Sequence, residues 1–436
     1  MPVITERRVH HRPLPHLPAH TPGGTVQAVG TGIITGAADD DPSAIGTYAS
    51  AGAAFGPGIL WAAPVLFPLM TVVMYLAAKI GHVSGVGFAA VIRQHYPRWI
   101  LTTVVVAIVA GNVIEAAADL GGVGAALHLL SPLPGLFWVL PIAAGILAIQ
   151  LFGSYTWIRN AFRWLALALL AYIGSALLAK PDLLQTVKAT LVPQIHWNRD
   201  YLAVLVAMIG TSGSTYLYGW QASQQVEEDI SMGRRRLSDR TSTTSATTLK
   251  SLAWDVVLGM FFSVVIMYFI LLSTAATIYP TRWGSIHTAA EAAQALAPLA
   301  GHAAGVLFAV GVIAVGFLAI PVMTIGAAYV VCDAAGWKSG LSAKRKDAPQ
   351  FYWIITAVMI VAAGLNYLGM NPIHALIAAG IVQGFLAPGL MLLLLLITCN
   401  PRIMGPWTNS RWVTVVAGLA ALASAAAAVA LIVSLH

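Results

Sequence analysis

Residues 31–44 read TGIITGAADDDPSA and place three consecutive carboxylates and a proline inside an otherwise apolar segment. An aspartate at bilayer depth costs about 2.5–3.5 kcal/mol on insertion scales, and such residues mark ion pathways. Pro42 lacks an N–H and clashes with the preceding turn, so a helix that starts near Ala28 is expected to break at about Asp41. Irregular backbone at this depth is tolerated only where it lines a cavity or is buried in protein, and broken helices of this kind form the sites of secondary transporters. An aqueous loop in which the aspartates only cap a helix is the alternative, but long apolar segments follow and leave no room for a large loop.

The composition is that of a polytopic membrane protein. Of 436 residues, 58% are hydrophobic and 9% are charged, whereas soluble domains contain roughly 25% charged residues. The formal net charge of +7 comes from basic residues in the loops, so it reports membrane topology rather than nucleic-acid binding. The two cysteines are far apart in sequence and indicate neither a disulfide framework nor a thiolate metal site. We therefore expect the lipid bilayer, and no nucleic acid, as a partner.

Eleven apolar segments are long enough to cross the bilayer if short turns separate them. We place them at residues 27–54, 57–80, 99–130, 134–152, 160–179, 200–229, 250–278, 302–334, 351–369, 372–398 and 411–434. The expected organisation is a flexible cytosolic tail (1–26), a first five-helix repeat (27–179), an external loop (180–199), a second five-helix repeat (200–398) with a cytosolic loop at 231–249, and a C-terminal eleventh helix (399–436). The tail has no apolar core, so no cleavable signal peptide is expected.

The basic residues predict the orientation of the chain. With the N-terminus in the cytosol, most Lys and Arg fall in inner segments, among them the Arg234–Arg236 run. The basic residues of the outer segments are then Lys180, Lys188, Arg199 and Arg282. This bias follows the positive-inside rule. We expect an integral protein of the bacterial inner membrane with a cytosolic N-terminus.

The sixth span carries a second interruption. Residues 210–215 read GTSGST and follow the apolar residues 201–209. Such a run weakens a helix at its centre, since glycine alone costs about 1 kcal/mol relative to alanine. A small-residue face for tight helix packing is the alternative. Because the first and sixth spans are both interrupted, the pattern favours two inverted repeats with a site between them.

Three further polar side chains lie at membrane depth. Glu115 and Asp119 are four residues apart and therefore share one helical face. They either form an ion or proton relay beside the site or hydrogen-bond to neighbouring helices. Gln383, in the tenth span, is a neutral oxygen donor that we regard as a candidate metal ligand.

The motifs resemble those of the Nramp family of divalent-metal transporters, and the likeness extends through most of the chain. The family's Asp-Pro-Gly-Asn signature reads Asp41-Pro42-Ser43-Ala44 in this chain. Its third-span Asp-Leu-Ala-Glu is similar to residues 119–122 (DLGG), and its sixth-span Ala-x-x-Met-Pro-His falls on residues 211–216 (TSGSTY). The resemblance implies an all-α, LeuT-like fold of 5+5 inverted repeats, with a metal site between broken helices 1 and 6. It also implies a transporter rather than an enzyme, with the metal ion as substrate and no cofactor.

This chain departs from the family pattern at four positions. Ala44 replaces the site asparagine, and Ser214 replaces the methionine whose sulfur favours softer metals. Gly122 and Tyr216 replace a glutamate and a histidine that the family associates with proton coupling. In lacking the methionine the chain is similar to the Nramp-related magnesium transporters.

The remaining donors at the site are oxygens, which suit hard cations such as Mg²⁺ and Mn²⁺. We expect Asp41 as the main ligand, with the Thr211 carbonyl and the Ser214 hydroxyl opposite, and Asp40 as a second ligand or a nearby charge. Asp39 is expected to face the vestibule. A symporter of a small organic solute such as an amino acid, on the same fold, is the nearest alternative, because a half-helix N-terminus can bind a carboxylate; an ion channel is a further one. The sequence does not indicate an oligomeric state.

Overall fold

The computed structural model of the protein describes residues 35–36, 38–152, 170–231, 244–280, 286, 288–341, 343 and 345–434. The longer helices are α2 (Pro42–Phe55), α3 (Ala62–Ser84), α5 (Arg98–His128), α6 (Gly135–Phe152), α10 (Arg199–Thr211), α11 (Tyr216–Ser231), α13 (Ala246–Thr277), α16 (Ala304–Ala335), α17 (Pro349–Leu365), α18 (Pro372–Cys399) and α20 (Arg411–Val433). The shorter helices are α4 (Phe88–His95), α8 (Leu170–Leu178), α9 (Leu183–Leu191), α14 (Ala289–Ala293), α15 (Ala297–Ala300) and α19 (Pro401–Met404). Within these residues the regular structure is entirely helical, as expected.

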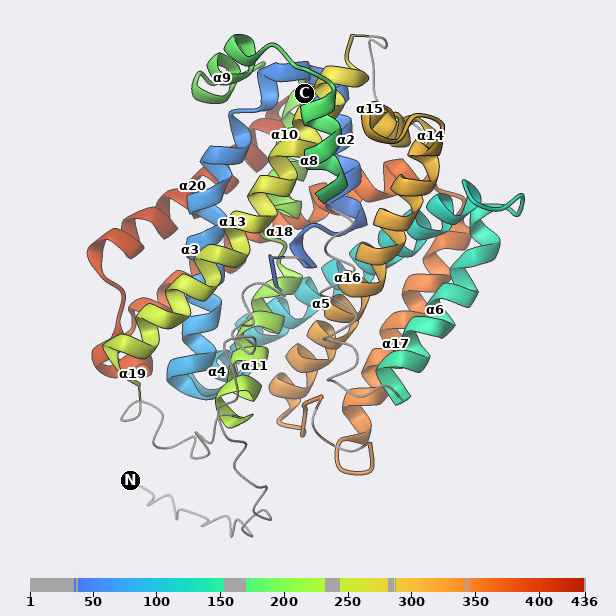
Figure 1. Cartoon of the computed structure of the whole chain (residues 1–436). Coiled ribbons are helices and arrows are strands. Elements are labelled where there is room, and N and C mark those ends of the chain that lie inside the picture. The colour runs from blue at the N-terminus through green and yellow to red at the C-terminus, as the bar shows by residue number, and fades with distance from the viewer. Residues whose placement is uncertain are drawn as a thin grey trace, which may run out of the picture.

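The long helices form one bundle in which most of them run between two ends (Figure 1). The short helices α9, α14 and α15 lie at one end, and α4 and α19 lie at the other (Figure 1). In the described part of the chain, nine helical segments are long and apolar enough to cross a membrane. These segments confirm a polytopic all-α membrane protein.

The predicted spans agree with the observed helices except where they reach undescribed residues. The first and fifth spans, 27–54 and 160–179, are described only from residue 35 and from residue 170, so a count of eleven is consistent with the structure without being established by it. The expected tail 1–26 lies outside the described residues, as do positions 232–243 of the expected loop 231–249. The domain boundaries stay a prediction.

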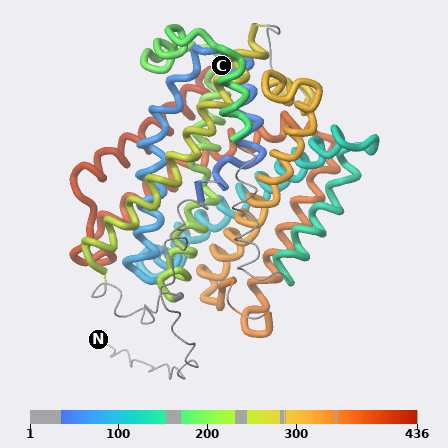
Figure 2. The backbone as a smooth tube through the Cα atoms, in the orientation of Figure 1, coloured from blue at the N-terminus to red at the C-terminus, as the bar shows by residue number. Residues whose placement is uncertain are grey.

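Helices from the two halves of the chain pack against each other in the bundle. The helix α5 packs on α16, and α2 packs on α13 (Figure 2). Within the second half, α10 packs on α18. A Cβ atom added at Gly210 of α10 would meet the Gly380 carbonyl oxygen at 2.0 Å and the Gly384 nitrogen at 2.3 Å. The small-residue interpretation of the sixth span is therefore correct for Gly210, because only glycine allows α18 to approach this closely.

Candidate functional site

The first helix is broken at the expected place. Ala38 and Asp39 are helical, Asp40 and Asp41 are not, and α2 begins at Pro42. Proline is favoured at a first helical position, where its missing N–H needs no partner. Asp41 is the N-cap, and its Oδ1 accepts hydrogen bonds from the Ala44 N–H (2.7 Å) and the Ser43 hydroxyl (2.8 Å). The local sequence thus explains both the break and the position of the Asp41 carboxylate.

The sixth span is broken between Thr211 and Tyr216. Gly213 has a φ of 140°, a conformation that favours glycine, and it turns the chain between α10 and α11. The Ser214 hydroxyl lies 3.1 Å from both the Gly210 and the Thr211 carbonyl oxygens. Both predicted ligands of this segment, the Thr211 carbonyl and the Ser214 hydroxyl, are therefore buried at the break and contact each other.

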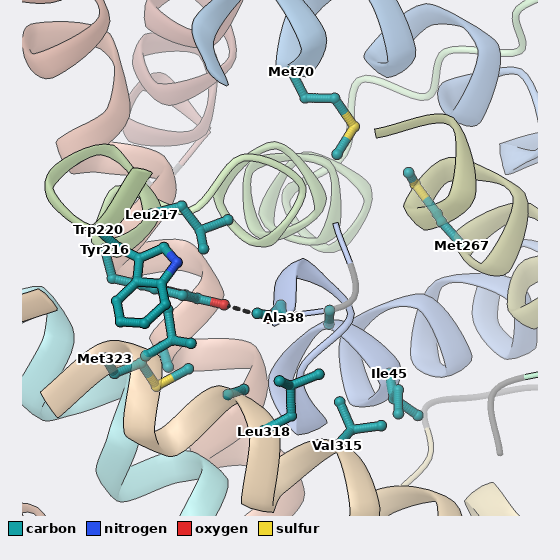
Figure 3. Packing of buried hydrophobic residues seen from close by; sticks show 14 of the residues in the cluster. Ala38, Ile45, Met70, Tyr216, Leu217, Trp220, Met267, Val315, Leu318 and Met323 are labelled. Carbon is teal, nitrogen blue, oxygen red and sulfur yellow. Dashed lines mark hydrogen bonds between the residues drawn. The ribbon is translucent and has the colours of Figure 1, made fainter. Parts of the chain in front are cut away.

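The two breaks face each other. The Tyr216 hydroxyl lies 2.7 Å from the Ala38 carbonyl oxygen and 2.9 Å from Asp41 Oδ2. Figure 3 shows the ring of Tyr216 pointing from α11 to Ala38 at the end of the first half-helix. The backbone amides of Gly213 and Ser214 lie near the Asp39 carboxylate. Segments about 175 residues apart in sequence thus meet at one site.

Helix α5 contributes two carboxylates to this site. The Ser43 N–H donates to Asp119 Oδ1 at 3.0 Å, and the Ser43 hydroxyl also contacts Glu115 Oε1. Both acids are fully buried. The predicted one-face arrangement of Glu115 and Asp119 is correct, and that face is directed at the Asp41 break.

Helix α13 contributes a residue that the sequence analysis did not identify. The Ser263 hydroxyl lies 2.9 Å from Asp39 Oδ2 and 3.2 Å from Asp40 Oδ1. Asp39 is fully buried rather than directed into an open vestibule, because α13 covers the break on this side. The only signal in the sequence is a single serine inside the apolar run of residues 256–272.

Gln383 of α18 contacts the backbone of the second break, in the sixth span, rather than that of the first. Its Oε1 accepts the Thr215 N–H at 3.3 Å and also contacts the Thr215 hydroxyl. The side chain of Gln383 is buried and also lies close to the Glu115 carboxylate of α5. Gln383 is therefore placed to support the start of α11, at the edge of the cluster of carboxylates.

The site is strongly acidic and built from oxygen donors. None of the carboxylates of Asp39, Asp40, Asp41, Glu115 and Asp119 forms an ion pair with a Lys, Arg or His of the described residues. All of them are fully buried, and an unpaired buried charge is expensive. In the described part of the chain, no group of three or more His, Cys, Asp or Glu side chains has the arrangement of a metal-binding site. A cation bound at this site would neutralise the carboxylates and would also take hydroxyl and carbonyl oxygens.

The glycine that replaces the family's third-span glutamate lies against the first break. A Cβ atom added at Gly122 would lie 3.3 Å from the Leu376 methyl groups and 3.5 Å from the Pro42 ring. Leu376 thus borders the place that a longer side chain would need, and the carboxyl groups of α5 at this site are those of Glu115 and Asp119.

Comparisons with known proteins agree with this architecture. Residues 32–434 match the family described as natural resistance-associated macrophage protein-like, or Nramp. The divalent metal cation transporter MntH of Bacillus subtilis is 25% identical over 421 residues, which cover 94% of this chain and 92% of that protein. The protein of the same name from Deinococcus radiodurans is 27% identical over 409 residues, which cover 89% of this chain and 85% of that protein.

Solved structures of low sequence identity share the fold. The Eremococcus coleocola manganese transporter matches with a TM-score of 0.70 at 19% identity, over 95% of this chain and 88% of that chain. MHP1, a nucleobase-cation-symport-1 family transporter, matches with a TM-score of 0.59 at 12% identity, over 91% of this chain and 90% of that chain. These likenesses confirm the predicted LeuT-type fold. The match over nearly the whole length, together with the paired helix breaks, shows that this chain belongs to the Nramp family, a family of membrane transporters rather than enzymes.

Proposed function

We propose that this protein is a secondary transporter that imports divalent metal cations, with Mg²⁺ and Mn²⁺ as its substrates. The transported ion is a substrate and not a cofactor. The relatives named as divalent metal cation transporters and as a manganese transporter support the substrate class.

The observation that carries the proposal is the contact between the two helix breaks at Asp41. The Ala38 carbonyl and the Asp41 carboxylate face Tyr216 across the gap, and the Thr211 carbonyl and the Ser214 hydroxyl lie in the opposite break. A cation seated between the breaks would take Asp41 as its main ligand and would displace the Tyr216 hydroxyl. Asp40 adds negative charge beside it, and Gln383 acts at the edge through Thr215.

The donor chemistry favours a hard ion. Carboxylate, carbonyl and hydroxyl oxygens suit Mg²⁺ and Mn²⁺, whereas thiolates and thioethers select softer metals. The chain has two thiols. Cys332 lies near the end of α16 and Cys399 is the last residue of α18, both far in sequence from the two breaks. The absence of a thioether at position 214 therefore favours Mg²⁺ and Mn²⁺ over Cd²⁺.

Alternating access is the mechanism we propose for import. The helices that bear the breaks would rock against α5, α16, α17 and α18, so that the site opens to one side of the membrane at a time. Import would proceed across the bacterial inner membrane toward the side that holds the N-terminus, as the basic residues of the loops indicate.

A transport assay with purified protein tests this proposal. Proteoliposomes receive Mg²⁺, Mn²⁺ or an amino acid in separate experiments, and uptake is measured for the wild type and for Asp41→Asn. We expect metal uptake by the wild type, no amino-acid uptake, and at least about a 10–100-fold loss in the variant, the range that even second-shell changes produce at metal sites. The asparagine retains an oxygen that can accept the Ala44 N–H, so the cap of α2 is preserved.

Asp182→Asn is the matched control. Asp182 also caps a helix with its carboxylate, accepting hydrogen bonds from Leu184 and Gln185 at the start of α9, but it is exposed and lies far from the breaks. Wild-type uptake by Asp41→Asn would contradict the proposed site, and uptake of an amino acid without metal uptake would replace the function.

A further inference from the structure

The Asp39 and Asp40 carboxylates form a pair of their own beside Asp41. Both are held by one hydroxyl, that of Ser263 on α13, at 2.9 Å and 3.2 Å. A serine hydroxyl carries a single proton, so it donates fully to only one of the two carboxylates at a time. The other carboxylate then lies close to the Ser263 oxygen without receiving a hydrogen bond from it.

The outer oxygens of this pair have no side-chain donor among the described residues. Asp40 Oδ2 is buried and accepts no hydrogen bond there, and Asp39 Oδ1 is buried in a carboxylate that faces only the backbone amides of Gly213 and Ser214. Neither residue forms an ion pair with a described Lys, Arg or His. Two adjacent ionised carboxylates at bilayer depth are costly unless protons or a cation neutralise them.

A tyrosine hydroxyl independently indicates a ligand at this place. Tyr218 of α11 is fully buried, and its hydroxyl oxygen has no hydrogen-bond partner among the described residues. This hydroxyl lies within electrostatic range of Asp39. A buried phenol without a partner is uncommon. The hydroxyl of Tyr48 also lies within range of Asp39 and Asp40, but it faces Thr211. One additional oxygen donor without a partner therefore borders the Asp39–Asp40 pair.

The pair lies beside the position that we assign to the transported ion, but its side-chain partner differs from those of Asp41. The Asp41 carboxylate accepts hydrogen bonds from Ala44, Ser43 and Tyr216, whose donors come from α2 and α11. The Asp39–Asp40 pair instead contacts α13 through Ser263. The pair thus has a side-chain partner on α13 that Asp41 does not share.

We infer that Asp39, Asp40 and Ser263 bind a second divalent cation next to the ion at Asp41. Two carboxylates match the charge of a divalent ion, and the all-oxygen donor set selects a hard one such as Mg²⁺ or Mn²⁺. This inference rests on the proposed function, and it assigns Asp40 to the second ion rather than to the first. It predicts that the break holds two ions at saturation.

Mn²⁺ binding to the purified full-length chain tests the inference. Equilibrium dialysis followed by metal analysis gives the number of ions bound, and electron paramagnetic resonance detects two Mn²⁺ ions close together by the broadening of their spectrum. We expect two Mn²⁺ per chain and a broadened spectrum for the wild type. The double variant Asp39→Asn/Asp40→Asn should bind one Mn²⁺ with an unbroadened spectrum, and Asp41→Asn should keep the ion held by the pair.

Ser263→Ala provides a milder variant that leaves every carboxylate in place. It should weaken one of the two Mn²⁺ affinities by about 10-fold or more, as expected for the loss of a supporting group at a metal site. Ser273→Ala is the control on the same helix, because its hydroxyl donates to the Ala295 carbonyl oxygen and lies away from the carboxylates. This control should bind two ions as the wild type does.

The outcomes separate the inference from the proposed function. One Mn²⁺ in the wild type that is lost in Asp41→Asn and retained in the double variant overturns the second site and leaves the proposed function intact. One ion that is lost only in the double variant also overturns a second site, because the pair would then be the single site. If the wild type binds no Mn²⁺ and transports no divalent metal, both the inference and the proposed function are wrong.

Discussion

The hydroxyl of Tyr216 is the residue-scale feature that most directly bears on ion binding. It contacts two oxygens, one from each end of the first break, at 2.7 Å and 2.9 Å. A carbonyl at a half-helix C-terminus and a carboxylate are both common cation ligands. An ion bound at the proposed site would therefore compete with Tyr216 for the same oxygens.

Tyr216→Phe should bind Mn²⁺ more tightly than the wild type. Removing the hydroxyl frees the Ala38 carbonyl from a hydrogen bond worth about 0.5–1.5 kcal/mol or the Asp41 carboxylate from one worth about 1.5–3 kcal/mol, so the affinity should rise at least about 2-fold and about 10-fold or more if the carboxylate is the acceptor. Calorimetric titration with Mn²⁺ measures this change. Weaker binding would show instead that the hydroxyl is itself a ligand of the ion.

Ser214→Met tests whether position 214 faces the ion. A thioether is a soft donor, so the variant should raise the competition of Cd²⁺ with Mg²⁺ uptake. The measurement is Mg²⁺ uptake in proteoliposomes at increasing Cd²⁺. If Cd²⁺ competes equally with both proteins, Ser214 contacts only its own helix carbonyls, Gly210 and Thr211.

At the scale of elements, the second half of the sixth span, α11, is held on both sides. Asp229 of α11 contacts His82 of α3 at 2.8 Å. Glu227 accepts from the Tyr329 hydroxyl of α16 at 2.5 Å and from the Leu341 N–H at 2.8 Å. Polar residues after a helix break could have lined an open vestibule, but Asp229 is fully buried in this arrangement. These contacts join α11 to α3 on one side and to α16 on the other.

Tyr329→Phe should loosen the contact between α11 and α16. A hydrogen bond to a charged group contributes about 1.5–3 kcal/mol, so opening should become at least about 10-fold more frequent. The measurement is the labelling rate of Ser223→Cys by a membrane-impermeant thiol reagent, in a chain whose Cys332 and Cys399 are replaced by alanine. Ser223 is buried on α11, which makes its labelling sensitive to opening.

Tyr352→Phe is the matched control for this experiment. The Tyr352 hydroxyl donates to the Ala343 carbonyl oxygen at 2.8 Å and so ties α17 to the preceding loop rather than to α11. An equal rise in labelling for both variants would mean that the contact with Glu227 does not hold α11 in place.

At the scale of the whole molecule, the structure bears on how transport is driven. The positions that the family associates with proton coupling hold Gly122 and Tyr216, and neither side chain titrates near neutral pH in its ordinary state. The carboxylates of Asp119 and Glu115 remain, and both contact Ser43 beside the break. We expect metal uptake without obligatory proton co-transport, driven by the membrane potential at about 2.3 kcal/mol per charge per 100 mV.

The lumenal pH of proteoliposomes during Mn²⁺ influx measures this coupling. We expect no acidification that follows uptake when an imposed potential drives the ion inward. Asp119→Asn is the comparison variant, since its amide oxygen can still accept the Ser43 N–H. Acidification that accompanies uptake in the wild type and disappears in this variant would show that protons are co-transported.

The helices and both breaks were predictable from the sequence because their causes are local. Apolar runs long enough to span a bilayer, the proline at position 42 and the glycine and hydroxyl residues at 210–215 act within a few residues of where they stand. The same reasoning gave Asp41 its place at the break and put Glu115 and Asp119 on one face. It also allowed two roles for Gly210, of which the structure shows close packing against α18.

Only the tertiary structure decided which side chains share the space around these breaks. Ser263 reaches Asp39 across 224 residues of sequence, and Tyr216 reaches Ala38 across 178. Leu376 borders Gly122, and Asp39 is enclosed by α13 instead of facing a vestibule. Such contacts depend on the angles and distances at which separate helices pack, which no local pattern specifies. The position of each break is therefore a property of the sequence, whereas the partners of its carboxylates are a property of the packed bundle.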